Sequence, residues 1–408
     1  MLLLLPASTP PQRRRWRLLS GTVALLLAGL TLLLPTPAQA DPGVTPKSGS
    51  FTVRGSGWGH GWGMSQYGAY GAARQGLSWQ RILAFYYPGT VRSSLPSGSM
   101  LRVWITRDND GSLRVLPSPG LNVRDGVGNR FTLPTGSKYL SWRISRYGSG
   151  YRLTYRTRDG RNIVQRTSLS RGTWSFHSPS GTVRVVLPRG SIRTYRGSMA
   201  LIKRGSSGRT VNRVSVENYV RGVVPAEMPT SWHADAVRAQ AVAARTYAVR
   251  IRNTRRYAGY DLCDTTACQV YRGVGAETAR GNAAVRATRG IILTYRGTVA
   301  LTQYASSNGG HSAQGDYPYL RAQRDPYDGV IRSQAWTRTL TAAQIQRQWP
   351  SVGTLRQLQV TSRDGAGAWG GRVRSIKLIG SRGTVTVSGS SFQYRFGLRS
   401  RLFTVLGA

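Results

Sequence analysis

The feature that constrains the fold most is an alanine-rich stretch near the middle of the chain. Residues 234–252 read ADAVRAQAVAARTYAVRIR and place alanine on nearly every side of a helix. Because alanine side chains are short, other elements can approach such a helix closely from several directions. We therefore predict a central helix here, with Ser231 as its N-cap and Asp235 in the first turn, where the helix dipole favours an anion.

The rest of the chain predicts mostly strands. Residues 100–205 consist of short alternating runs separated by Gly, Asp, Asn and Ser, which is typical of antiparallel strands. Further helices are expected near residues 77–90 and 276–288, and no repeat of fixed period is visible. The predicted fold class is α+β: an antiparallel β-rich, multi-lobed protein with a few central helices around a catalytic cleft. The expected parts are a signal peptide (1–40), an N-terminal segment that packs on the catalytic core (41–99), a β-rich lobe (100–205) and a catalytic domain (206–408).

The first forty residues have the pattern of an export signal. Four arginines precede the apolar run 18–34, and Ala38-Gln39-Ala40 has the small residues of a cleavage site. A membrane anchor is the alternative, since the apolar run is near the length that spans a bilayer, but the cleavage pattern favours removal. The export route, general or twin-arginine, stays open. We expect a secreted or cell-wall protein with no transmembrane segment after cleavage before Asp41.

The charge of the chain predicts a polyanionic partner. Lysine and arginine number 57 against 15 acidic residues, for a net charge of +42. Removal of residues 1–40, which hold four arginines and no acidic residue, lowers the net charge to +38. Nucleic acid would be the first candidate in the cytoplasm. The export signal makes the anionic polymers of the cell wall the better one, and no aromatic-basic motif supports a nucleic-acid partner.

Glutamate is rare in this chain, and one glutamate lies in an unusual setting. Only three are present, Glu217, Glu227 and Glu277. Glu227 lies between two prolines in PAEMP, with no neighbouring cation, so burial could raise its pKa as a general acid requires. Its carboxylate could equally favour the N-terminus of the helix that follows. The local sequence leaves both interpretations open.

Three arginines of the predicted helix recur every seven residues. Arg238, Arg245 and Arg252 lie on one stripe of the helix, about 10 Å apart from one to the next. They line an anionic or sugar-binding cleft, or they belong to a solvated helix face. The solvated face is the better interpretation for Arg252, and the cleft is the better one for Arg238 and Arg245.

A glycine-dense block near residue 60 carries a second group of candidate residues. His60 lies between two glycines, and Ser65, Gln66 and Tyr67 follow closely. Glycines let the backbone approach a ligand, and the three polar side chains can hydrogen-bond sugar hydroxyls. The alternative is a simple glycine-rich turn. A Ser-His-Asp hydrolase built from Ser65 and His60 has no nucleophile-elbow pattern to support it.

The two cysteines predict a disulfide. Cys263 and Cys268 suit an exported chain with one bridge. A zinc site with His311 is the weaker alternative, because no fourth ligand and no short Cys/His spacing is present. We therefore expect no metal and no other cofactor.

Four long motifs resemble the stage II sporulation protein D and amidase-enhancer family (SpoIID/LytB). The resemblance implies the fold and chemistry of a peptidoglycan lytic transglycosylase, which cuts the MurNAc to GlcNAc bond and leaves a 1,6-anhydro-muramyl end. It also implies action on glycan strands, including strands stripped of stem peptides. The motifs are VSVENYVRGVVPAEMPTSWHADAVRAQAVAARTYAVR, YASSNGGHS, YPYLRAQRDPYD and GSGWGHGWGMSQYGAYGAA.

The resemblance also implies roles for individual residues. The acid/base glutamate of the family falls on Glu227, its cleft cations fall on Arg238 and Arg245, and its other substrate-binding positions fall in the Gly-His-Gly block and in the YASSNGGHS loop. The block stands near the C-terminus in sporulation members but opens the mature chain here, so the order is permuted and residues 55–90 are expected to border the cleft. A histidine that helps some relatives hold zinc near Cys263 is missing. The other substrate-binding positions, in the Gly-His-Gly block and the YASSNGGHS loop, are His60, Ser65, Gln66, Tyr67, Ser307 and Asn308.

A chain poor in acidic residues suits this chemistry. A glycosidase that uses water generally needs two carboxylates around the scissile bond. A lytic transglycosylase can work with one, which protonates the leaving oxygen and then, as a base, helps the muramyl 6-hydroxyl to close on C1. The implied partners are glycan strands, anionic wall polymers and an amidase. The alternative function is a non-catalytic, wall-binding amidase enhancer.

Overall fold

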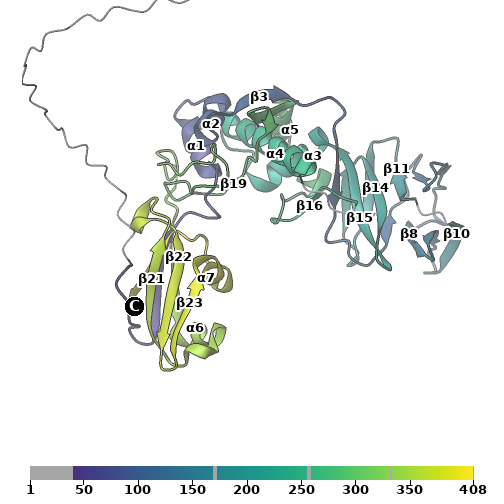
Figure 1. Ribbon diagram of the computed structural model, residues 1–408. Coiled ribbons are helices and arrows are strands. Elements are labelled where there is room, and N and C mark those ends of the chain that lie inside the picture. Colours follow the sequence, from purple (N-terminus) through teal and green to yellow (C-terminus); the bar gives the residue numbers. More distant parts are fainter. Residues whose placement is uncertain (1–39, 169–171, 255–258, 331, 408) are drawn as a thin grey trace, which may run out of the picture. The chain divides into compact units, whose positions relative to one another are not determined.

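The computed structural model describes residues 40–168, 172–254, 259–330 and 332–407 (Figure 1). The predicted signal peptide, apart from Ala40, lies outside the described residues. Within the described ranges, no helix is long and apolar enough to cross a membrane. The fold class is α+β, as predicted, with strands more abundant than helices.

The alanine-rich stretch forms the central helix α4 (Ala234–Thr254), which confirms the prediction. Its alanines are buried on several sides because other helices pack against it, as Figure 1 shows for α1, α2, α3 and α5. Asp235 lies in the first turn as predicted. The predicted cap does not hold, because the helix begins directly after His233, whose Nδ1 accepts the N–H of Asp235 at 3.3 Å. The surrounding helices are α1 (Gln66–Arg74), α2 (Trp79–Tyr86), α3 (Val216–Glu227) and α5 (Ala279–Ala287).

The predicted antiparallel strands are confirmed, and they form two sheets. The seven-stranded sheet has the order β16-β4-β15-β14-β11-β6-β7 and contains β4 (Met100–Trp104), β6 (Asn122–Arg124), β7 (Arg130–Thr132), β11 (Trp174–His177), β14 (Ser198–Arg204), β15 (Ser207–Ser215) and β16 (Leu262–Cys263). The six-stranded sheet has the order β10-β9-β8-β5-β12-β13 and contains β5 (Leu113–Val115), β8 (Ser141–Tyr147), β9 (Gly150–Arg156), β10 (Asn162–Ser168), β12 (Thr182–Val186) and β13 (Ile192–Arg196).

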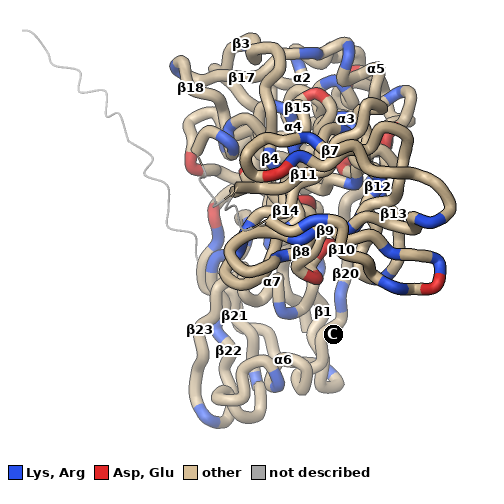
Figure 2. The backbone as a smooth tube through the Cα atoms, turned by 90° about the vertical axis from the view of Figure 1, so that its right-hand side faces the viewer, with Lys and Arg blue, Asp and Glu red and all other residues tan. Residues whose placement is uncertain are grey.

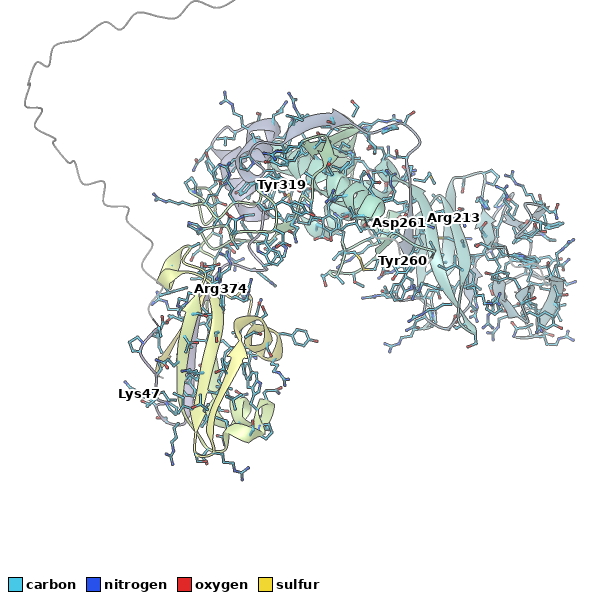
Figure 3. The ribbon with its side chains drawn as sticks, viewed as in Figure 1. Lys47, Arg213, Tyr260, Asp261, Tyr319 and Arg374 are labelled. Atoms are coloured by element: carbon cyan, nitrogen blue, oxygen red, sulfur yellow. A yellow bond between two sulfur atoms is a disulfide. The ribbon has the colours of Figure 1, made fainter. Side chains whose placement is uncertain are left out.

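One pair in these sheets is parallel and carries the chain toward the disulfide. Strand β16 runs beside β4. Asp261, labelled in Figure 3, holds the two strands together. Its carboxylate accepts two hydrogen bonds from Arg102, one from the main-chain N–H at 2.8 Å and one from the guanidinium at 2.7 Å. The segment that follows β16 is therefore anchored to the sheet at its start.

The two ends of the described chain lie together in a hydrophobic core that is separate from the core around α4. Strand β1 (Ser50–Ser56) lies between β20 (Ala335–Thr341) and β24 (Phe403–Gly407) and pairs antiparallel with both. Its buried Phe51 and Val53 pack in a cluster with side chains of three further strands and two helices. These are β21 (Leu355–Arg363), β22 (Val373–Gly380), β23 (Gly383–Ser388), α6 (Ala342–Gln348) and α7 (Gly389–Phe396).

Short strands place the glycine-dense block beside a loop near residue 305. Strand β2 (Met64–Ser65) pairs parallel with β19 (Tyr304–Ala305). Alternate glycines before β2 have positive φ, for example Gly59 at 111°, where a Cβ would lie 2.7 Å from the Cβ of Ala305. Side chains at these glycines would force the two segments apart. The remaining short strands are β3 (Val91–Ser94), β17 (Ile291–Tyr295) and β18 (Thr298–Val299), which form a small sheet with the order β18-β17-β3.

Candidate active site

The glycine-dense block, the end of α3, the disulfide loop and β19 enclose a cavity of about 540 Å³. Its walls carry aromatic rings, side-chain amides and a single carboxyl, that of Glu227. Cavities of this size are typical of small-ligand sites. The lining residues are Trp58, Gly59, His60, Gln66, Glu227, Tyr247, Thr266, Ala267, Cys268, Gln269, Gln303, Tyr304, Ala305 and Ser306.

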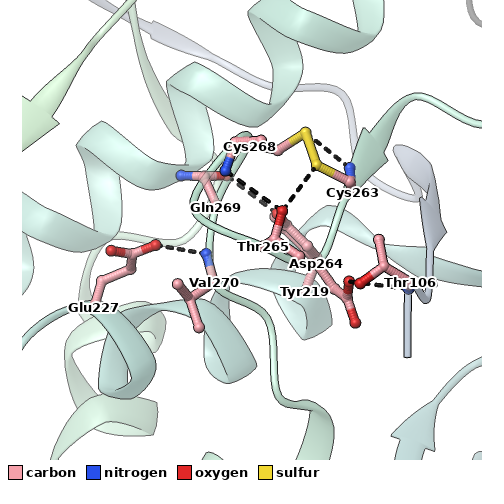
Figure 4. Close-up of a disulfide and its surroundings, with 10 residues drawn as sticks. Thr106, Tyr219, Glu227, Cys263, Asp264, Thr265, Cys268, Gln269 and Val270 are labelled. Atoms are coloured by element: carbon pink, nitrogen blue, oxygen red, sulfur yellow. Dashed lines mark hydrogen bonds between the residues drawn. A yellow bond between two sulfur atoms is a disulfide. The ribbon is translucent and has the colours of Figure 1, made fainter. Parts of the chain in front are cut away.

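Glu227 is the last residue of α3, and its carboxyl group has a raised pKa. Burial raises this pKa, while the hydrogen bond from Val270 and the charge of Arg272 lower it. The N–H of Val270 donates to the carboxylate at 2.6 Å (Figure 4). A helix C-terminus also disfavours an anion. The alternative role at the start of the next helix does not hold, because Glu227 ends α3, seven residues before α4 begins, and its carboxylate accepts a hydrogen bond from Val270. The carboxyl group therefore has the environment that a general acid needs.

Gln66 connects the glycine-dense block to the end of α3. Its Nε2 donates to the main-chain oxygen of Glu227 at 3.1 Å and to Oε1 of Gln240 at 3.3 Å. Gln66 and Glu227 are 161 residues apart in the sequence. The structure thus brings the block to the Glu227 cavity, as the resemblance implied.

His60 lies on the same wall and is neutral at physiological pH. Burial, and then the charge of Arg372, lower its pKa to about 4. Its Nδ1 accepts the N–H of Trp62 at 2.9 Å, and the two rings stack with centroids 4.8 Å apart. His60 can therefore serve as a neutral hydrogen-bonding group in this cavity.

Two other residues of the block hold the fold together and do not line the cavity. Ser65 is the N-cap of α1, where its hydroxyl accepts the N–H of Gly68 and donates to Asp328, both at 2.9 Å. The ring of Tyr67 packs on Trp232 with centroids 4.9 Å apart. The bonds of Ser65 and His60 go to different partners, so the two do not form a hydrolytic pair.

The two loop residues predicted to bind substrate are also buried. Ser307 donates to Asp328 at 2.7 Å, and Asn308 donates to Asp325 at 2.7 Å. Both side chains are about 1% exposed. The neighbouring Ser306 lines the cavity in their place.

The predicted arginines of α4 do not reach this cavity. The guanidinium of Arg245 is fully buried and donates to both carboxylate oxygens of Glu217, at 2.8 and 2.9 Å. Arg238 pairs with Asp235 at 3.2 Å and faces a smaller cavity beside Trp232. We therefore correct the prediction for Arg245: the side of the helix that carries it packs against α3 and α5, which gives it a structural role.

The disulfide between Cys263 and Cys268 is confirmed, with the two Cα atoms 5.5 Å apart. Its loop forms one wall of the cavity, and the chain reaches Val270 two residues after Cys268 (Figure 4). Both sulfurs are engaged in the bridge, so they are not available as zinc ligands. Among the described residues, no group of three or more His, Cys, Asp and Glu side chains gathers where it could hold a metal ion.

Sequence reasoning missed several cavity residues. Gln269 donates to the hydroxyl of Tyr304 at 2.9 Å and accepts from Tyr219 at 3.3 Å, so its side chain is fixed between a buried ring, that of Tyr219, and a half-buried one, that of Tyr304. Val270 acts through its main chain, which no side-chain pattern reveals. Trp58 lies inside the quoted glycine-dense motif and could have been found there, since it is a large exposed ring (54%) on the cavity wall.

Comparison with known proteins identifies the domain that holds Glu227. Residues 204–295 match the family model described as Stage II sporulation protein (SpoIID). Residues 204–295 are therefore a SpoIID domain, which confirms the resemblance to the SpoIID/LytB family for this part of the chain.

Three relatives illustrate the similarity. The chain is 40% identical over 132 residues to the amidase enhancer of Bacillus subtilis strain 168, covering 31% of this chain and 17% of that protein. It is 32% identical over 164 residues to stage II sporulation protein D of the same strain, covering 35% and 48%. An uncharacterized protein of Brachyspira hyodysenteriae is 39% identical over 119 residues, covering 29% and 32%. The chain thus spans less than half the length of each relative.

Removal of the disulfide is expected to weaken the wall that it forms. The double variant Cys263→Ser/Cys268→Ser should lower the free energy of unfolding by about 2 kcal/mol, because a small closed loop is opened in the unfolded chain. Equilibrium denaturation of both proteins measures this. As a control, thiol titration of the denatured, unreduced wild type should find no reactive thiol, and two reactive thiols would contradict the bridge.

Proposed function

We propose that this protein is an exported peptidoglycan lytic transglycosylase that cleaves MurNAc to GlcNAc bonds, with Glu227 as its single acid and base. The observation that carries the proposal is the one carboxyl group in the cavity, with a pKa raised by burial. The similarity to stage II sporulation protein D and to an amidase enhancer supports a role at the cell wall.

The composition of the cavity supports a glycosidic substrate. Trp58, Tyr247 and Tyr304 offer ring faces on which a sugar can pack, and Gln66, Gln269 and Gln303 offer amides for its hydroxyls. Among the described residues that line the cavity, no second carboxyl accompanies Glu227. A hydrolase of the usual two-carboxylate kind is therefore less well supported than an enzyme in which the substrate supplies its own nucleophile.

The proposed mechanism has two proton transfers through one group. The protonated carboxyl of Glu227 donates its proton to the glycosidic oxygen as the bond from C1 of the muramyl residue to that oxygen breaks. The resulting carboxylate then accepts the proton of the muramyl 6-hydroxyl, whose oxygen forms the new bond to C1. The N–H of Val270 stabilises the carboxylate between the two transfers.

Digestion of purified glycan tests this function. We expect the purified protein to release fragments with 1,6-anhydro-muramyl ends from glycan strands, both stripped of stem peptides and intact, as mass spectrometry would detect. Fragments with reducing ends instead would indicate hydrolysis. Absence of any product from both substrates, together with a faster reaction of an added amidase, would favour the amidase-enhancer function.

A further inference from the structure

The six-stranded sheet has two faces of opposite character. Its inward face is apolar, with Val115, Trp142 and Val185 fully buried, and it packs against β14 and β15. Side chains alternate along a strand, so every second residue points to the outward face. The six strands together contain nine arginines and no aspartate or glutamate. Figure 2, which looks onto β8, β9, β10, β12 and β13, shows basic residues recurring along them.

The register places these arginines side by side on the outward face. Arg114 lies directly opposite Arg143 in the β5–β8 pair. On the next strand, β9, Thr154 is opposite Arg143. Arg152 comes two residues before Thr154, so its side chain points to the same face of the sheet. Neighbouring strands are about 5 Å apart, and like charges directly opposite each other are destabilising. A bound anion would remove this repulsion.

The protein supplies little charge to balance this row. None of the ion pairs between described residues includes Arg114, Arg143 or Arg152. The Nε atoms of Arg143 and Arg152 are buried and have no hydrogen-bond partner. Some other arginines do have a carboxylate partner, such as the buried Arg245 with Glu217 and the half-buried Arg196 with Glu277.

The charges of Arg114 and Arg143 act on a buried carboxyl group, that of Asp108, which is only partly ionised at neutral pH. Burial raises its pKa to about 7, against the hydrogen bond from Thr210 and the charges of Arg114 and Arg143, which lower it. Its Oδ2 accepts the hydroxyl of Thr210 at 2.6 Å. One partly ionised carboxyl leaves the row strongly positive at neutral pH.

The six strands offer few aromatic rings to a ligand: Tyr147 is exposed, while Trp142, Tyr151, Tyr155 and Tyr195 are buried. The guanidinium of Arg152 lies 4.2 Å from the ring centre of Tyr147, and that of Arg146 lies 4.9 Å from the ring centre of Tyr151. Proteins that bind single-stranded nucleic acid offer free rings on which bases stack. One exposed ring with a guanidinium on one face is a poor platform for successive bases, whereas planar guanidinium groups suit oxyanions such as phosphate, which they can contact through two N–H groups.

We propose that the outward face of the six-stranded sheet, around Arg114, Arg143 and Arg152, binds a linear phosphodiester polymer that carries no bases. The cavity of Glu227 has no arginine in its lining, so this surface and the proposed catalytic site are separate. The surface would hold the protein on an anionic matrix while the cavity acts on a different polymer. This inference does not depend on the chemistry assigned to Glu227.

Binding of poly(glycerol phosphate) by the full chain tests the surface. The variant Arg114→Gln/Arg143→Gln should weaken binding at least tenfold at about 0.15 M salt, because it removes the facing pair of charges. The control Arg338→Gln/Arg374→Gln removes the same amount of charge from exposed positions of β20 and β22, outside the six-stranded sheet (Arg374 is labelled in Figure 3). This control should change the Kd less than twofold. Equal weakening by both variants would overturn the proposal in favour of dispersed charge.

Two further measurements complete the test. Oligo(dT) and polygalacturonate are offered at the same charge concentration, and tighter binding of either one than of poly(glycerol phosphate) would overturn the phosphodiester assignment. The thermal midpoint of Arg114→Gln/Arg143→Gln should not fall, since a repulsive pair has been removed. If this variant does not fold, Arg152→Gln/Arg184→Gln replaces it, because Arg184 is an exposed residue of the same sheet.

Discussion

The Glu227→Gln variant is expected to release at least a hundredfold less anhydro-muramyl product than the wild type. Glutamine keeps the shape of the side chain, and its Oε1 can still accept the N–H of Val270. It has no transferable proton, and general acid catalysis typically contributes about a hundredfold or more. The measurement is product release from stripped glycan strands at matched protein concentration, with circular dichroism to confirm equal folding.

A matched control distinguishes the site from a general effect of losing a carboxyl. Glu277 accepts hydrogen bonds from Arg196 at 2.6 and 2.9 Å and lies outside the Glu227 cavity. Glu277→Gln should therefore keep product release within about twofold of the wild type, because no proton is transferred there. Undiminished product from Glu227→Gln would remove Glu227 as the acid.

The pH dependence follows from the direction of the Glu227 pKa shift. Burial raises this pKa, so the carboxyl keeps its proton to higher pH than an exposed glutamate does. Product release should decline as pH rises through that raised pKa. His60, whose pKa is lowered to about 4, contributes no limb on the alkaline side. If the residual product release of Glu227→Gln still declined with rising pH, that decline would come from the titration of another group.

Local patterns predicted the parts of the fold that depend on near neighbours in the chain. The alanine-rich helix α4, the antiparallel strands after residue 100 and the Cys263–Cys268 bridge each follow from a short stretch of sequence. The pairing of β1 with β20 and β24 joins strands from opposite ends of the described chain. Neither alternation nor turn residues specify such a partner, because many strands in this sequence have the same pattern.

The residues of the candidate site could likewise be predicted only where a short stretch of sequence or the motif resemblance identified them. The rarity of glutamate and the motif resemblance singled out Glu227, and the resemblance also placed His60 and Gln66 beside it. A seven-residue spacing puts Arg238, Arg245 and Arg252 on one stripe, but it does not say what packs against each point of that stripe. The answer depends on Glu217, which lies on another helix, so burial of Arg245 could not be predicted from the spacing.

The Arg245→Ala variant is expected to lower the free energy of unfolding by about 3 kcal/mol. Removing one partner of a buried ion pair typically costs about 3–5 kcal/mol, and the lower end applies because Glu217 keeps some exposure (22%) and its bond from the N–H of Gly290 at 3.0 Å. Arg245 also donates to three main-chain oxygens, of Ala241, Val285 and Ile291, and the variant would lose these three hydrogen bonds.

The matched control for this prediction lies on the same helix. Arg238 forms an exposed pair with Asp235, with 37% and 21% of the side chains accessible, so Arg238→Ala should cost about 1 kcal/mol or less. Equilibrium denaturation in urea of the two variants and the wild type provides the comparison. If Arg245→Ala were as stable as Arg238→Ala but needed far more glycan for half-maximal rate, Arg245 would contact substrate after all. Because its guanidinium is fully buried against α3 and α5, we expect the loss to appear in stability and not in the substrate requirement.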